Sequence, residues 1–166
     1  EELLAAEREF VDLPKSPLWF AYEYPQVNPA PESAIVARER SSVAKFYYPL
    51  RHLKTLSLDE AQLYWRTQHG PVIRAQANGT RTLRYVQVHR FETPLEDAWR
   101  TARGTVTETY TGHAELWFDR TAAAAPAPSS DWQTAASRAE EDERNFIDFT
   151  RSGMWWAKEH VLMDRI

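Results

Sequence analysis

The segment SLDEAQLYWRTQHGPVIRAQANGTRTLRYVQVHRFE (57–92) decides the fold, because a helical pattern gives way to a strand pattern within it. Ser57 and Glu60 have the spacing of a capping box, which predicts that a helix begins here. Apolar side chains then recur at helical spacing as far as Gly70-Pro71, where we expect the helix to break or kink. Asn78-Gly79 is a turn signal, so a turn is expected before the next element.

The strand predicted after this turn alternates cleanly between its two faces. We expect Tyr85, Gln87 and His89 to share one face of it. Val86 and Val88 fall on the opposite face.

Similar patterns occur along the rest of the chain. Further strands are predicted at 42–53, 112–120 and 152–164, and helices at 94–103 and from residue 131 onward. Apart from the short helical stretch at 94–103, the order is β-α-β-β-α-β. This order predicts an α+β fold with the ferredoxin-like arrangement, in which two helices cover one face of the sheet.

The uncovered face of this sheet is expected to carry Tyr85, Gln87 and His89 together with Glu115 and Trp117. A face so rich in aromatic and apolar groups is unsuited to water. We therefore expect it to pack on a second sheet. The domain would then form an α+β barrel with a second copy, supplied by self-association or by a tandem repeat.

The two ends of the chain resemble each other. Residues 7–28 (EREFVDLPKSPLWFAYEYPQVN) align without a gap to residues 143–164 (ERNFIDFTRSGMWWAKEHVLMD), with eight identities in 22 positions. Each copy has the pattern of a helix end, a turn and an aromatic strand. We therefore interpret 1–28 as the C-terminal remnant of a first repeat, 29–41 as a linker and 42–166 as one complete domain.

Composition argues against several classes of partner. The formal net charge is −4 and no basic run occurs, so nucleic acid is an unsuitable partner. The chain contains no cysteine, which excludes disulfides and thiolate metal sites. No apolar run approaches the roughly 20 residues that span a bilayer, and EELLAAEREF (1–10) lacks the basic start of a signal peptide. We expect a cytoplasmic protein that makes no membrane contacts.

Three motifs in order resemble the EthD family of the dimeric α+β barrel group. The first is SLDEAQLYWRTQHGPV (57–72), a helix that opens with Ser and ends in His-Gly-Pro. The second is the Tyr-x-Gln-x-His strand within LRYVQVHRF (83–91), and the third is GHAELWFD (112–119). The resemblance covers about residues 42–164.

This resemblance implies a barrel that holds a small hydrophobic or aromatic molecule, with catalysis by His and Tyr. Similar proteins include polyketide cyclases, lactone isomerases, decarboxylases and cofactor-free oxygenases. We therefore expect a lyase- or isomerase-type enzyme of secondary metabolism that moves protons on a polyketide-like or aromatic substrate. Two alternatives stay open: a non-catalytic metabolite binder or assembly module, and a small monooxygenase.

The candidates for catalysis are two histidines and a tyrosine. Neutral imidazole, with a pKa near 6.5, serves as base and then as acid near neutral pH, which favours His69 and His89. Tyr85 lies in phase with His89 and is placed to hold an enol or phenolate oxygen. The structural alternatives are that His69 bonds backbone groups at a helix end, and that His89 is a polar strand end.

Five further residues are substrate-binding candidates. Gln87 and Tyr48 would hold a substrate oxygen, and Trp65 and Trp117 would line the pocket. Glu115 would face an apolar cavity, where burial raises the pKa of a carboxyl group. It would there act as an acid or orient a histidine. The alternative for Glu115 is a salt bridge with an arginine.

We expect no metal and no organic cofactor. His89, His113 and Glu115 are the residue types of a two-His, one-carboxylate site, but close metal-ligand spacing is missing from the sequence. The five glycines form neither a dinucleotide-binding motif nor a P-loop.

Overall fold

A computed structural model describes residues 2–28, 35–123 and 130–162 of the chain. Its central feature is a five-stranded sheet with the strand order β1-β3-β4-β2-β5, in which all neighbours run antiparallel. The strands are β1 (Phe20–Val27), β2 (Val43–Leu50), β3 (Thr82–Phe91), β4 (Gly112–Asp119) and β5 (Trp155–Ala157). The expected α+β class is therefore confirmed.

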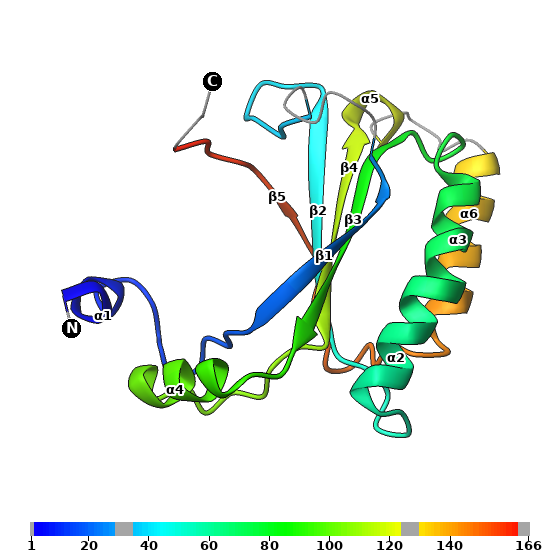
Figure 1. The fold of residues 1–166 in the computed structure, drawn as a ribbon. Helices are drawn as coiled ribbons and strands as arrows, with labels where there is room; N and C mark the ends of the chain where they lie inside the picture. The colour runs from blue at the N-terminus through cyan, green and yellow to red at the C-terminus, as the bar shows by residue number, and fades with distance from the viewer. Residues whose placement is uncertain (1, 29–34, 124–129, 163–166) are drawn as a thin grey trace.

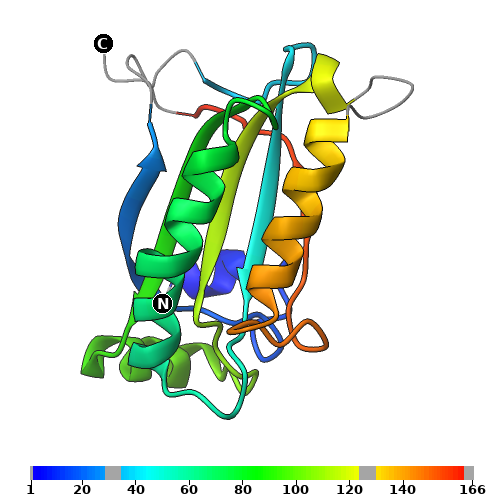
Figure 2. The same cartoon turned by 90° about the vertical axis from the view of Figure 1, so that its right-hand side faces the viewer.

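Helices lie on both sides of this sheet, but one side carries most of them. A continuous helical rod consists of α2 (Leu58–Tyr64), the π-helical turn η2 (Trp65–His69) and α3 (Gly70–Gln76). This rod and α6 (Ser130–Glu143) lie side by side over one face, here called the helix face (Figures 1 and 2). The other described helices are α1 (Glu2–Glu7), α4 (Pro94–Arg103) and the short α5 (Arg120–Ala123).

The predicted start of the rod is confirmed, and of the break or kink expected at Gly70-Pro71 no break occurs. Ser57 accepts a hydrogen bond from the backbone of Glu60, and the Glu60 carboxylate accepts one from the backbone of Ser57. The helix passes through Gly70-Pro71 without a break. Pro71 falls in the first turn of α3, where a missing N–H is tolerated. The preceding π-helical turn, closed by the Gly70 N–H bonding to the Trp65 carbonyl, supplies the wider turn.

The strands predicted at 42–53 and 112–120 are confirmed as β2 and β4, and the strand predicted after the Asn78-Gly79 turn as β3. The helix predicted at 94–103 is confirmed as α4. The last predicted strand, 152–164, is much shorter in the structure. Only Trp155–Ala157 pair with β2, and residues 163–164 lie outside the described part of the chain.

The assignment of side chains to the two faces was wrong for β4. Gln87 on β3 lies opposite Ala114, while Val86 lies opposite Glu115. Cross-strand partners project from the same face. Glu115 and Trp117 are therefore on the face opposite to Tyr85, Gln87 and His89. Alternation shows which residues of one strand belong together, but the register between strands decides which sets share a face.

The face that carries Tyr85, Gln87 and His89 is covered by the helices of the same chain. The expectation that this face packs on a second sheet is therefore wrong. Its core contains Tyr48, Leu50, Trp65, Tyr85, Ala114, Phe146 and Ile147. The opposite face, here called the open face, has a smaller cluster of Ala37, Val86, Val88 and Trp117.

The two segments that resemble each other occupy the two edges of this one sheet. β1, from the N-terminal segment, pairs with β3 from Phe20 opposite Phe91 to Val27 opposite Tyr85. β5, from the C-terminal segment, pairs with β2 at the far edge. Residues 20–27 are thus part of the same sheet as 43–157. Within the described part of the chain, we find no helix that is both long and apolar enough to cross a membrane.

Phe146 is the most instructive core position to test. Its side chain is 0% exposed and packs against the rings of Tyr64, Trp65 and His69. We expect Phe146→Ala to lower the free energy of unfolding by about 3–5 kcal/mol, because it leaves a cavity between α6 and the rod. Urea unfolding followed by tryptophan fluorescence would measure this. Phe10→Ala, at a side chain that is 81% exposed, is the matched control and should change stability little.

Candidate functional site

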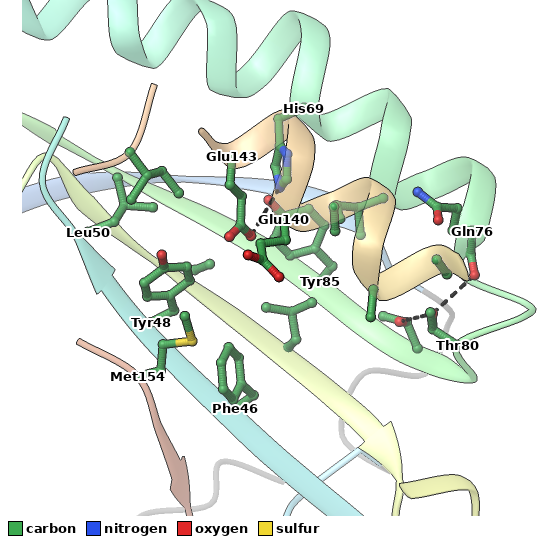
Figure 3. Close-up of a pocket in the computed structure, with 18 of the residues that line it drawn as sticks. Phe46, Tyr48, Leu50, His69, Gln76, Thr80, Tyr85, Glu140, Glu143 and Met154 are labelled. Atoms are coloured by element: carbon green, nitrogen blue, oxygen red, sulfur yellow. Dashed lines mark hydrogen bonds and ion pairs between the residues drawn. The ribbon is translucent and has the colours of Figure 1, made fainter. Parts of the chain in front are cut away.

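A cavity of about 610 Å³ lies between the sheet and the helices α3 and α6 (Figure 3). This volume is in the range of small-molecule pockets. Most of the wall is apolar, formed by residues such as Phe46, Ile73, Leu116, Phe118, Ala139 and Trp156. The shape and lining suit a small hydrophobic or aromatic molecule.

Four polar side chains from four different elements meet at this cavity. His69 comes from η2, Glu143 from the end of α6, Tyr48 from β2 and Tyr85 from β3. Figure 3 shows the Glu143 carboxyl group and the Tyr48 ring turned toward the same space. Polar groups that converge in an apolar pocket are the usual sign of a binding or catalytic site.

His69 is buried and held by a carboxylate from the neighbouring helix. Its Nδ1 lies 2.7 Å from Oδ2 of Asp142, and the hydroxyl of Tyr64 donates to Oδ1 of the same residue at 2.8 Å. Burial lowers the pKa of His69, although Asp142 acts in the opposite direction. The imidazole is therefore neutral near pH 7, with Nδ1–H donating to Asp142 and the lone pair of Nε2 free.

Glu143 completes the arrangement, with Oε1 4.0 Å from Nε2 of His69. Burial raises the pKa of Glu143 to about 8, and the nearby Glu140 and Asp142 add to the effect. The carboxyl group is therefore mostly protonated at neutral pH. A neutral imidazole beside a neutral carboxylic acid supplies both a base and an acid.

The hydroxyl of Tyr48 is buried and has no hydrogen-bond partner among the described residues. Burial raises the pKa of Tyr48, and the charge of Glu143 adds to this, so the phenol keeps its proton. A buried hydroxyl without a partner is costly unless a ligand or water satisfies it. This group is therefore a ready hydrogen-bond donor for a ligand oxygen.

Of these site residues, His69, Tyr85, Asp142 and Glu143 fall within a segment that matches a known protein family, and Tyr48 lies just before it. A comparison with models of protein families matches residues 53–150 to the EthD domain. The chain belongs to the EthD family. The resemblance drawn from the sequence motifs is thereby confirmed. Comparisons with curated proteins and with solved structures found no match.

In this EthD domain, His89 and Gln87 belong to a buried chain of hydrogen bonds beside the cavity. Nε2 of His89 lies 3.1 Å from the Gln87 side-chain oxygen, and Gln87 donates to the Tyr85 hydroxyl at 3.0 Å. The His89 ring stacks on Trp65 with centroids 4.5 Å apart. Burial, helped by the charge of Arg66, lowers the pKa of His89 to about 4.

Trp65 and Tyr85 are in the cavity wall and are bonded to each other. The indole N–H of Trp65 donates to the Tyr85 hydroxyl at 3.1 Å, and the Trp65 carbonyl accepts from Gln87 at 2.9 Å. The structure therefore brings together Tyr48, Trp65, His69 and Tyr85 at the cavity, with Gln87 and His89 behind them.

Glu115 and Trp117 are separated from this site by the sheet. Glu115 pairs with Lys45 at 3.0 Å, which is a lysine rather than the arginine considered from the sequence. His113 lies 3.2 Å from Glu115, and Trp117 donates to Glu159 at 2.9 Å. The carboxylates of this cluster are compensated by charge and hydrogen bonds.

The metal set considered from the sequence is also divided by the sheet. His89 projects from the helix face, whereas His113 and Glu115 project from the open face. Within residues 2–28, 35–123 and 130–162, no three or more His, Asp and Glu side chains are grouped so as to hold a metal ion.

Asp142 and Glu143 are the site residues that sequence reasoning missed. Both lie in the acidic run EEDE (140–143), which has the pattern of a solvated helix end. The only available signal was that Glu143 is identical to Glu7 in the aligned end segments. Their contact with His69 joins two helices far apart in sequence, which local patterns do not predict.

The raised pKa of Glu143 predicts a stability change with pH. Its folded-state pKa, about 8, exceeds the ordinary value of 4.5, so the folded protein binds the extra proton between these values. The free energy of unfolding should therefore fall as pH rises through this window. We expect Glu143→Gln to lack this dependence. Its free energy of unfolding relative to that of wild type should therefore rise by at least about 1.4 kcal/mol from pH 5 to pH 8.5.

Urea unfolding at a series of pH values measures this difference. Glu141→Gln, at an exposed carboxylate of the same helix, is the matched control and should follow the wild-type profile. Parallel profiles for wild type and Glu143→Gln would contradict the raised pKa of Glu143.

Proposed function

We propose that this EthD domain is an enzyme that moves protons on a small hydrophobic or aromatic carbonyl compound held in the cavity. The observation that carries the proposal is the short distance between a basic nitrogen and a carboxyl group. Nε2 of His69, neutral and oriented by Asp142, lies 4.0 Å from the carboxyl group of Glu143, whose pKa is about 8. Both groups border a cavity whose wall is mostly apolar.

The proposed reaction begins with removal of a proton from the carbon next to the carbonyl. Nε2 of His69 takes this proton, and the electron pair of the C–H bond moves onto the carbonyl oxygen. The hydroxyl of Tyr48 donates a hydrogen bond to that oxygen, and Glu143 supplies a proton to it. The resulting enol can then regain a proton, close a ring or lose a leaving group, which covers isomerase, cyclase and lyase reactions.

Tyr85 would act as a second donor to the substrate oxygen. Its oxygen already accepts from Trp65 and Gln87, which leaves its own O–H free to donate. His89 would position Gln87 rather than contact the substrate, since its Nε2 bonds Gln87 and its ring is stacked on Trp65. This refines the expectation that His89 acts directly as an acid or base.

We also propose that the domain has the ferredoxin-like arrangement and that a second copy covers its open face. The support is that the two similar end segments form opposite edges of one sheet, as expected if the N-terminal strand belongs to a neighbouring repeat. Trp155 on this face is 49% exposed and lies against Tyr47 at a centroid distance of 5.5 Å. A second copy would cover this aromatic surface.

Proton exchange on a simple aryl ketone tests the proposed chemistry. We expect the wild-type protein to catalyse exchange of the methyl protons of 2-acetylnaphthalene with deuterium from D2O, as followed by proton NMR. His69→Asn and Glu143→Gln should each slow the exchange by about 10²- to 10⁴-fold, the usual contribution of a general acid or base. Asp142→Asn should act through His69 and shift the pH profile as well as the rate.

His160→Ala is the control, because His160 is exposed and lies outside the cavity. Ligand binding is measured in parallel by naphthalene fluorescence. Tight binding without exchange would instead favour a non-catalytic binder, a reading that the mostly apolar wall also supports. Absence of binding would refute the assignment of the cavity as the site.

Light scattering tests whether a second copy of the chain binds to the open face. We expect the wild-type chain to have about twice the 19.3 kDa mass of one chain, and Trp155→Glu to reduce it to that of the monomer. A charge placed on the open face opposes its burial against another apolar surface. Leu63→Glu, at an exposed side chain of α2 in the helical layer, should leave the mass unchanged. A wild-type monomer at high concentration would contradict self-association of this chain.

A further inference from the structure

A second hollow, of about 400 Å³, lies near the start of β2 and the end of β5. Its floor is formed by small apolar residues, including Ala37, Val43, Ala44 and Ala157. Its charged wall residues are Arg38, Arg120 and Lys158, all of them basic. We call this hollow the basic groove.

The charge of the basic groove is local and largely uncompensated. The chain as a whole has a formal net charge of −4, whereas the wall of this groove contains three basic side chains and no acidic one. The side chains of Arg38 and Arg120 have no acidic partner among the described residues, and both are exposed. Lys158 lies 3.6 Å from Glu39, but both groups are more than half exposed, so this ion pair is weak.

Trp156 lies between the basic groove and the cavity, because it is a lining residue of both. On the cavity side its ring packs against Phe46 and Phe118, with centroid distances of 5.4 and 6.2 Å. The residue is 60% exposed, so it is not sealed inside the core. The cavity and the groove are therefore neighbours that share one exposed aromatic residue.

The two spaces have opposite electrostatic preferences. The cavity wall contains Glu140 and Glu143, and its remaining surface is mostly apolar, so an anion is disfavoured there. The groove offers two guanidinium groups, which bind carboxylate and phosphate through paired hydrogen bonds. A single ligand satisfies both only if its apolar body and its anionic group are separated.

We infer that the basic groove binds the anionic group of a ligand whose apolar body fills the cavity. The inferred ligand class is an elongated amphiphile: an aromatic or aliphatic carbonyl body, a connecting chain, and a terminal carboxylate or phosphate. This inference deepens the proposed function and rests on it, because the cavity must hold the reacting body. Arg38 and Arg120 are the residues that select for the anion.

Matched naphthalene probes test the inference. The probes are naphthyl-alkanoic acids with chains of increasing length, the corresponding alkyl phosphates, and the uncharged N-methylamides of the same acids. Dissociation constants follow from naphthalene fluorescence at low and high salt. The protein variants are wild type, the double variant Arg38→Glu/Arg120→Glu, and the control Arg138→Glu, which reverses an exposed charge on α6.

We expect the wild type to bind the long-chain acid or phosphate about tenfold more tightly than the amide at low salt. Raising the salt concentration should reduce this preference, since the arginines are exposed. The preference should vanish in Arg38→Glu/Arg120→Glu and persist in Arg138→Glu, while all three proteins bind the amide equally. Short-chain acids, which keep the anion inside the cavity, should show no preference. Comparison of acid and phosphate identifies the group that the groove prefers.

Three contrary results have different meanings. Equal binding of acid and amide by the wild type would overturn the anion subsite and leave the cavity as the site of the proposed reaction. Failure of every probe to bind would overturn both proposals. A preference that survives in Arg38→Glu/Arg120→Glu would show that the anion is bound elsewhere, which also contradicts the inference.

Discussion

The contact between Trp65 and β3 positions the whole site. The Trp65 ring stacks on His89 at 4.5 Å, its indole N–H donates to Tyr85, and its carbonyl accepts from Gln87. One residue thus fixes the helical rod to the sheet through both its side chain and its backbone. All of these groups are buried, so loss of any member would leave a polar atom without a partner, which is costly.

How far the sequence predicted this structure depends on the range of each interaction. The capping pair Ser57 and Glu60 and the alternation along β3 are local, and both were predicted correctly. The register that places Glu115 opposite Val86 is not local, so the two strands were assigned to the wrong relative faces. Of the site residues, His69 was identified by its motif. Asp142 was missed because its role depends on how two distant helices pack.

The two faces of the sheet separate structural polar groups from those suited to chemistry. On the open face, Glu115 faces Lys45 and His113 at about 3 Å, so its charge is compensated. On the helix face, Glu143 is half-buried beside other acids, which raises its pKa, and the Tyr48 hydroxyl has no partner among the described residues. Uncompensated groups of this kind lower stability, and their retention in a cavity is typical of functional sites.

The π-helical turn η2 sets the directions in which the rod presents its site side chains. Trp65 and His69 stand at its two ends, and both are almost fully buried, at 1% and 3% exposed. A π-helical turn contains more residues than an α-helical turn, so it changes the direction of every side chain that follows. The turn therefore allows one rod to use Trp65 as its anchor on β3 and also to direct His69 toward Asp142 and Glu143. Conversion of η2 to regular α-helix would rotate His69 relative to Trp65, and the acid–base pair would separate while the sheet stayed intact.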